Sequence, residues 1–154
     1  MQRARYVEIN RARAPPDPTF LVAERAGFER LGTVAGPAGL IHDPRDSTML
    51  AIYHDDPEGT PLAELRSGAG LTVSEDAALP EGLEEQRIPA GRYACVVHEG
   101  SYERLGDTWA RLMGEWVPAS GQRVGDGPSY EVYRNTPGAA SEDELRTELY
   151  VPLA

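Results

Sequence analysis

A Glu-x-Tyr pattern occurs twice near the C-terminal end, as Glu131-Val132-Tyr133 and Glu148-Leu149-Tyr150. Because side chains alternate between the two faces of a strand, each Glu shares a face with its Tyr if these segments are strands. In an antiparallel hairpin, one register places Glu131 opposite Tyr150 and Tyr133 opposite Glu148. Two carboxylates framed by two phenols would hold an organic cation by charge and by aromatic contact. The alternative is an ordinary solvated sheet face.

Aromatic residues also follow one side of a helix that we expect to begin after Ser101. Residues at spacings of three and four form this stripe: Tyr102, Leu105, Trp109, Leu112, Met113 and Trp116. Such a stripe is typical of core packing. Trp109 lies in the middle of the helix and is the member that we expect to reach a ligand as well. Pro118 and Gly121 predict the end of the helix.

The chain contains an internal echo. Tyr53, Pro57 and the Glu-Leu-Arg run at 64–66 recur 80 positions later, and the segment 28–31 resembles 109–112. This repeat predicts a single domain over residues 1–154, built from two halves at about 1–80 and 81–154. In this alignment Ala51 and Gly68 correspond to Glu131 and Glu148. The carboxylates would therefore occur only in the second half, opposite small residues of the first.

Each half is expected to contain a strand, a helix and two further strands. In the second half the strands are Gln86–His98, Ser129–Tyr133 and Leu145–Leu153. In the first half the strands are Tyr6–Ala14, Met49–His54 and Gly70–Ser74, with a helix that begins at Asp17-Pro18 and includes Phe20, Leu21, Phe28 and Leu31. The prediction is an α+β fold, an antiparallel sheet with two helices and a cleft between the halves.

The charge balance excludes several classes of partner. The chain has 25 acidic and 15 basic residues, a net charge of −10. An acidic chain is a poor partner for nucleic acid or for an anionic membrane, since both require basic patches. No apolar run has the length of a membrane helix, and the N-terminus lacks the apolar core of a signal peptide. The single cysteine, Cys95, predicts a reducing cytoplasm and an inert core thiol.

Other chemistry finds little support in the sequence. The run His54-Asp55-Asp56-Pro57-Glu58 contains metal-ligand types, but Pro57 and Gly59 indicate a turn, so we expect no metal site. No Gly-x-Ser-x-Gly motif and no helix-turn-helix pattern occur. We therefore expect no cofactor.

Four ordered segments resemble the GyrI-like family. The run AIYHDDP at 51–57, followed by TP at 60–61 and ELRS at 64–67, is similar to the family stretch YYDDP…TP…LRSD. The run IPAGRYA at 88–94 is similar to IPGGxYA. The segments YEVYRN at 130–135 and TELYVPL at 147–153 are similar to the two closing strands of the family. The resemblance covers about residues 18–154.

The resemblance implies a duplicated strand-helix-strand-strand fold whose central cleft binds hydrophobic, often cationic, small molecules beside a carboxylate. It implies that Glu148 is the key acidic residue, with Glu131 second. The full predicted ligand-binding set is Glu148, Glu131, Tyr133, Tyr150, Trp109, Tyr53 and Tyr93. The leading hypothesis is a stand-alone binding protein, a monomer, that senses or sequesters such compounds. The alternatives are inhibition of DNA gyrase by protein contact, and hydrolysis of cyclopropane-type toxins with Glu148 as general base.

Overall fold

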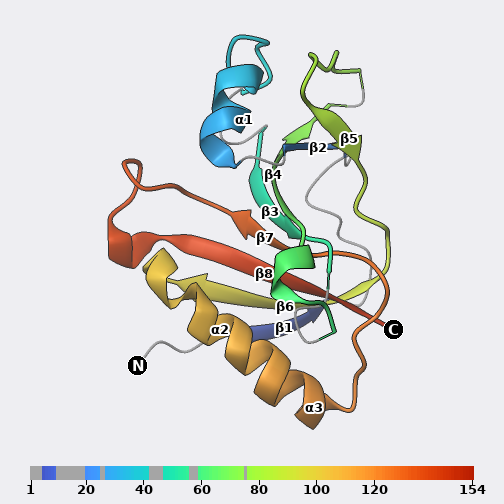
Figure 1. Ribbon diagram of the computed structural model, residues 1–154. Coiled ribbons are helices and arrows are strands. Elements are labelled where there is room, and N and C mark those ends of the chain that lie inside the picture. The colour runs from blue at the N-terminus through green and yellow to red at the C-terminus, as the bar shows by residue number, and fades with distance from the viewer. Residues whose placement is uncertain (1–4, 10–19, 25–26, 42–46, 56–58, 75) are drawn as a thin grey trace.

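The computed structural model describes residues 5–9, 20–24, 27–41, 47–55, 59–74 and 76–154. In this part of the chain, eight strands form one antiparallel sheet in the order β1-β6-β8-β7-β3-β4-β2-β5 (Figure 1). The strands are β1 Arg5–Ile9, β2 Phe20–Glu24, β3 Met49–Tyr53, β4 Ser67–Val73, β5 Glu84–Gln86, β6 Arg92–Glu99, β7 Ser129–Tyr133 and β8 Arg146–Leu153. The expected α+β class and antiparallel sheet are confirmed.

The strand order is symmetric about its central pair. β7 and β3 meet in the middle, β8 and β4 flank them, and β6 and β2 come next. The two outer strands are exchanged between the halves, because β1 pairs with β6 and β5 pairs with β2. A duplication that places β3 and β7 at equivalent positions would produce this order. The duplication itself, and the single domain over 1–154, stay predictions.

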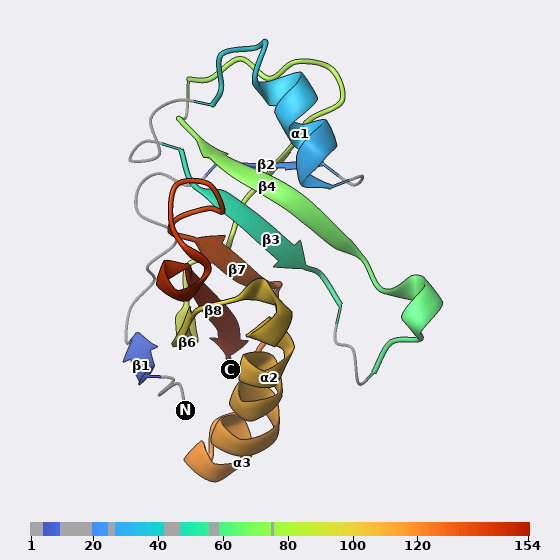
Figure 2. The ribbon, with the colours of Figure 1, turned by 90° about the vertical axis from the view of Figure 1, so that its left-hand side faces the viewer.

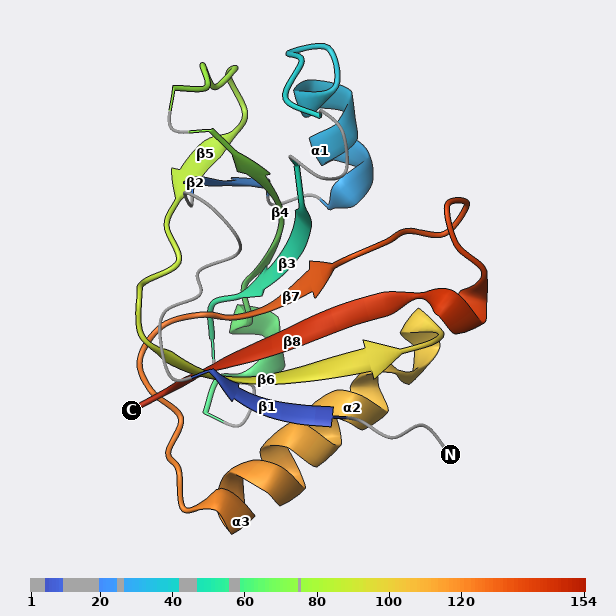
Figure 3. The same cartoon turned by 180° about the vertical axis from the view of Figure 1, so that it is seen from behind.

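Both helices cover the same face of the sheet, as the turned view in Figure 2 shows. α1, Phe28–Ala35, packs Leu31 and Ala35 against a cluster with Ala69 and Leu71 of β4. α2, Leu105–Arg111, packs Leu105 against Leu149 and Val151 of β8, with Ala94 and Val96 of β6 in the same cluster. Seen from behind, the strands β1, β6 and β8 lie in front of α2 (Figure 3). None of the helices in the described part of the chain is long and apolar enough to span a membrane.

The first predicted helix is wrong over residues 20–24, which form β2. This strand pairs with β4 on one side and with β5 on the other, and these pairings outweigh any helical tendency of the segment. The helix begins only at Phe28. The preceding Gly27 has a φ of 103°, a non-helical conformation that glycine adopts readily, so the helix cannot extend back through it. The expected helix start at Asp17-Pro18 lies outside the described residues, as do positions 10–14 of the first predicted strand.

The second helix continues past Pro118, so of the two residues predicted to end it only Gly121 does so. It runs from a 3₁₀ turn at Tyr102–Arg104 through α2 and a π-helical turn at Leu112–Trp116 into α3, Val117–Ser120. Pro118 follows the π turn and occupies the first turn of α3, where its missing N–H is tolerated. The helix ends at Gly121, which adopts the left-handed conformation with φ 72°. The expected strand Gln86–His98 divides into β5 and β6.

Candidate functional site

The site is built on one row of residues that crosses the centre of the sheet. Glu131 of β7 lies opposite Leu149 of β8 on one side and Ala51 of β3 on the other, and Ala51 lies opposite Ala69 of β4. Directly opposed residues in antiparallel strands project from the same face. Leu149 packs in the α2 cluster and Ala69 in the α1 cluster. Glu131 is therefore on the helix-covered face, between the two helices.

Glu131 is a buried carboxylate held by two neutral donors. The residue is 3% exposed. The indole Nε1 of Trp109 donates to Oε1 at 2.5 Å, and the hydroxyl of Tyr133 donates to Oε2 at 2.6 Å. Among the described residues, no arginine forms an ion pair with Glu131.

Aromatic rings surround this carboxylate. Tyr53 meets Trp109 edge to face with centroids 5.9 Å apart, while Phe28 and Tyr102 each pack 5.5 Å from Tyr133. Burial, followed by the charge of Glu131, raises the pKa values of Tyr53 and Tyr133 far above the ordinary phenol value. Burial and the same charge raise the pKa of Tyr102. These phenols therefore remain neutral hydrogen-bond donors around a negative centre.

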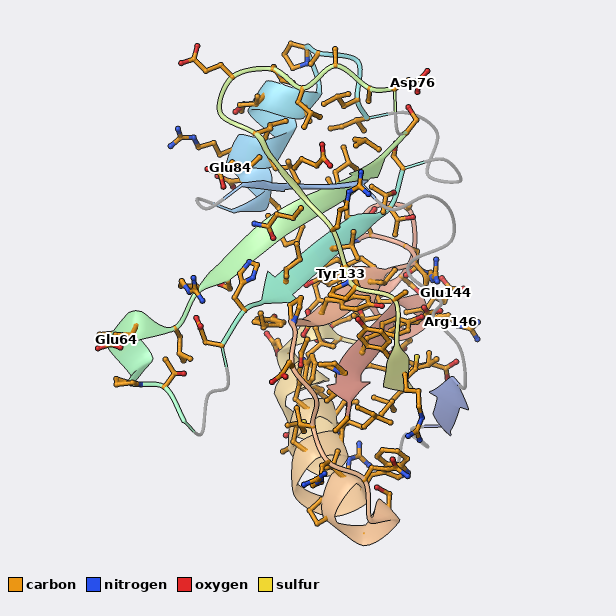
Figure 4. The ribbon with its side chains drawn as sticks, turned by 90° about the vertical axis from the view of Figure 1, so that its right-hand side faces the viewer. Glu64, Asp76, Glu84, Tyr133, Glu144 and Arg146 are labelled. Atoms are coloured by element: carbon orange, nitrogen blue, oxygen red, sulfur yellow. The ribbon has the colours of Figure 1, made fainter. Side chains whose placement is uncertain are left out.

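A small cavity opens beside the carboxylate. It has a volume of about 210 Å³ and is lined by Gly27, Phe28, Ala51, Tyr53, Ser67, Gly68, Ala69 and Tyr133. Figure 4 places Tyr133 at the centre of the molecule, between the part that contains α1 and the part that contains α2. Small side chains on β3 and β4 leave this space open, whereas aromatic rings form its other walls. Each oxygen of Glu131 accepts one bond from the protein and retains a second lone pair, and a carboxylate beside aromatic rings can attract an organic cation.

Glu148 lies on the opposite face of the sheet, so the predicted hairpin register is wrong. In the structure Tyr130 pairs with Tyr150 and Val132 pairs with Glu148. A register that differs by one residue sends the alternate side chains to the other face. Glu131 with Tyr133 and Glu148 with Tyr150 therefore do not form one constellation of two carboxylates and two phenols.

Glu148 has a structural partner on its own face. Arg134 Nη2 donates to its Oε2 at 2.7 Å, and the Tyr150 hydroxyl donates to the same oxygen at 2.6 Å. Burial raises the pKa of Glu148, but the bonds from Arg134 and Tyr150 outweigh this effect and hold it below the ordinary value. Tyr93 packs in the same apolar cluster as Tyr150 and donates to the carbonyl of Pro89.

The structure therefore divides the predicted ligand-binding set. Glu131, Tyr133, Trp109 and Tyr53 come together on the helix-covered face, and Glu148, Tyr150 and Tyr93 belong to the other face. Two further aromatic residues of the site, Phe28 and Tyr102, were not in the set. Tyr102 shares the helical stripe of Trp109, and Phe28 corresponds to Trp109 in the internal echo, so both carried a signal.

The other expectations concern Cys95 and metal ions. Cys95 is buried in the apolar cluster with Tyr150, and burial is the main reason that its thiol pKa rises to about 11. No group of three metal-ligating side chains occurs among the described residues. Asp55 pairs with Arg66, and the positions 56–58 of the acidic turn lie outside the described residues.

Fold and site together define a class of protein, an α+β domain with a small aromatic pocket and a buried carboxylate between two helices. The family model of the GyrI-like small molecule binding domain matches residues 25–154, and the chain belongs to this family. A DNA gyrase inhibitor of Yersinia enterocolitica is 40% identical over 90 residues, which cover 56% of this chain and 57% of that protein. The chain thus matches little more than half the length of that relative.

Solved structures share the fold. The C-terminal domain of EcmrR superposes with a TM-score of 0.70 at 19% identity, over 99% of this chain and 97% of that domain. The structure of SAV2435 bound to tetraphenylphosphonium superposes with a TM-score of 0.63 at 10% identity, over 99% of this chain and 94% of that one. The expected family and fold are confirmed, and the chain is a member of a small-molecule-binding domain family.

Proposed function

We propose that this chain binds small aromatic organic cations in the cavity beside Glu131, and so senses or sequesters them. The observation that carries the proposal is the environment of the Glu131 carboxylate. It is buried, and its recorded partners are neutral donors and aromatic rings. Removing a charge from water costs several kcal/mol even after relaxation, and two hydrogen bonds from neutral donors recover only part of that cost. A cation in the cavity would recover the remainder.

The aromatic walls support the same ligand class. Phe28, Tyr53 and Tyr133 line the cavity with aromatic rings, and Tyr133 also donates to Glu131, so a delocalised cation would gain from both the rings and the charge. The cavity of about 210 Å³ is smaller than the roughly 300–1,000 Å³ of pockets for drug-sized molecules. This favours ligands with one or two rings. SAV2435, a structural neighbour, is described in complex with an organic cation, tetraphenylphosphonium.

Calorimetry with a charged probe and its neutral isostere tests the proposal. Benzyltrimethylammonium carries the charge, and neopentylbenzene has the same shape without it. We expect the cation to bind at least about tenfold more tightly, a difference of about 1.4 kcal/mol. Glu131→Gln keeps the size of the side chain and removes its charge, and we expect it to lose most of this preference.

Glu148→Gln is the matched control, because it makes the same chemical change on the other face of the sheet. It should leave the affinity for the cation within about twofold of the wild type. Equal binding of the cation by Glu131→Gln, or an equal loss in both variants, would contradict the proposal. Near-UV circular dichroism checks that both variants keep the native packing.

A second candidate function is inhibition of DNA gyrase by protein contact. The Yersinia enterocolitica relative carries this name, and a net charge of −10 suits the basic surface of a DNA-handling enzyme. A supercoiling assay with purified gyrase tests it. Normal supercoiling in the presence of a large excess of the protein would dismiss this function, whereas inhibition that persists in Glu131→Gln would assign it to the surface rather than to the cavity.

A further inference from the structure

His98 is a buried polar residue that does not itself line the cavity. It lies on β6 and is 3% exposed. Its Nδ1 is 2.7 Å from the hydroxyl of Thr108, and its Nε2 is 2.9 Å from the carbonyl oxygen of Ser101. Because a carbonyl oxygen can only accept, Nε2 carries a proton, and in the neutral ring Nδ1 accepts from the Thr108 hydroxyl. One side chain thus ties the sheet to the second helix at two points.

Each of these points directly precedes an aromatic residue of the site. Ser101 precedes Tyr102, whose ring packs 5.5 Å from Tyr133. Thr108 precedes Trp109, whose indole N–H donates to Glu131. Any rotation of this helix about its axis, or any sliding along β6, would move both aromatic side chains relative to β7.

The backbone of this helix does not by itself fix the rotation of the helix about its axis, so tertiary contacts must do so. It begins with a 3₁₀ turn at Tyr102–Arg104 and passes into a π turn at Leu112–Trp116. The number of residues per turn changes at each of these transitions, so the direction of a side chain depends on where the transitions fall. The apolar contacts of the α2 cluster are not directional, whereas the two bonds of His98 are.

We propose that His98 is a positioning residue for the binding site. Through Ser101 and Thr108 it fixes the helix so that the indole N–H of Trp109 points at Glu131 and the ring of Tyr102 packs on Tyr133. Its effect on ligand affinity rests on the proposed function above. Its effect on the bond between Trp109 and Glu131 does not, because that bond exists without a ligand.

Thr147 provides a matched control for removing the Thr108 hydroxyl. It lies on β8 between His98 and Tyr133 in the same cross-strand row. It is 0% exposed, and its hydroxyl has no hydrogen-bond partner, whereas Thr108 is 2% exposed and bonds to His98. Threonine-to-valine changes at these two positions remove the same buried group, once from α2 and once from β8 on the face that α2 covers. Only one of them removes a bond.

The indole proton of Trp109 is the direct readout. The chain has two tryptophans, so Trp116→Phe leaves Trp109 as the source of the single indole signal in a ¹H–¹⁵N spectrum. A short bond to a carboxylate moves this proton downfield, and Glu131→Gln gives the position without the carboxylate. In this background we expect Thr108→Val to move the signal toward that reference and to weaken binding of benzyltrimethylammonium about fivefold. Thr108→Ser should restore both values, and Thr147→Val should change neither.

His98→Asn serves if Thr108→Val fails to fold. Its Oδ1 stays close to the position of Nδ1 and can accept from Thr108, while the donor to Ser101 is lost. The indole signal should therefore move part of the way toward the Glu131→Gln position, and an unchanged signal would contradict the role of the Ser101 contact. An indole signal that stays unchanged in Thr108→Val, with only a lower melting temperature, would overturn the positioning role. If the wild type binds neither probe, the proposed function fails, and the indole signals still decide the role of His98.

Discussion

Glu131 and Glu148 lie on neighbouring strands, but their charges are compensated in different ways. Glu148 has a guanidinium partner, Arg134, at 2.7 Å, and its side chain is 20% exposed. Glu131 has only neutral donors and is nearly inaccessible. A carboxylate that already has a cationic partner gains little from a ligand cation, whereas one without such a partner gains more. Of the two, Glu131 is therefore the residue that we propose for binding, whereas Glu148 pairs with Arg134.

The lowered pKa of Glu148 predicts an acid-dependent contribution to stability. Burial raises its pKa, but the bonds from Arg134 and Tyr150 lower it by a larger amount. The net shift of the pKa is therefore downward from 4.5. The unfolded state therefore takes up the proton first, and the stabilisation is present above about pH 4.5 and is lost as the pH falls through the folded pKa. We expect Glu148→Gln to lower the free energy of unfolding at pH 7 by about 1–2 kcal/mol.

Urea titrations of wild type and Glu148→Gln at pH 7, 5, 4 and 3 measure this contribution. The difference between the two proteins should shrink as the pH falls. Glu81→Gln removes one negative charge from an exposed turn and controls for the change in net charge. A difference that stays constant from pH 7 to pH 3 would show that the ion pair does not contribute through ionisation of Glu148.

The residues of the site could be predicted only in part, because alternation along a strand gives a relative face and not the pairing register. Glu131 and Tyr133 share a face as predicted, and so do Glu148 and Tyr150. The register between these two strands depends on the connection from Arg134 to Leu145, which is too long for a short turn to fix it. The structure pairs Val132 with Glu148, and this one-residue difference separates the two motifs.

At the scale of elements, the second helix is set by where its backbone can change geometry. Pro118 predicts the end of the helix when only α-helical hydrogen bonding is considered. In the structure the helix passes through a π turn at Leu112–Trp116 and continues into α3. β2 was predicted as helix because its apolar residues also fit a helical period. Its two hydrogen-bonded neighbours, β4 and β5, decide the outcome, and those partners are distant in sequence.

Glycine-to-alanine changes at the end and in the middle of this helix should have opposite effects on the free energy of unfolding. Gly121 has φ 72°, and no atom lies within 4 Å of an added Cβ, so Gly121→Ala is strained by its backbone alone. We expect a loss of about 1 kcal/mol in the free energy of unfolding. Gly106 lies within α2, also has open space around an added Cβ, and has helical backbone angles. Gly106→Ala should therefore stabilise the protein by about 0.5–1 kcal/mol.

Chemical unfolding of the two alanine variants and of the wild type measures both changes in the free energy of unfolding. A stabilising Gly121→Ala would mean that the helix end relaxes away from the left-handed conformation. A destabilising Gly106→Ala would place a neighbour close to this part of α2. The first result would move the C-terminal boundary of the helix that presents Trp109.

At the scale of the whole molecule, the two halves are joined by three strand pairings. β3 pairs with β7 at the centre, β1 of the first half pairs with β6, and β5 of the second half pairs with β2. Neither half can keep its complete sheet alone, because each outer strand belongs to the other half. The site also takes residues from both halves, with Ala51 and Tyr53 on one side and Glu131 on the other. The sequence echo predicts two similar units, but this exchange of outer strands has no local signal.

The exchange predicts that the two halves unfold together. Both tryptophans, Trp109 and Trp116, lie in the second half, and both phenylalanines, Phe20 and Phe28, lie in the first. Tryptophan emission therefore reports on one half, and the ¹⁹F signal of incorporated 4-fluorophenylalanine reports on the other. In urea we expect the two signals to give the same midpoint and the same slope. Loss of the first half removes a neighbour from β6 and β7, and loss of the second half removes one from β2 and β3. A ¹⁹F transition at clearly lower urea than the tryptophan transition would show two independent units, and the site between them would then form only when both are folded.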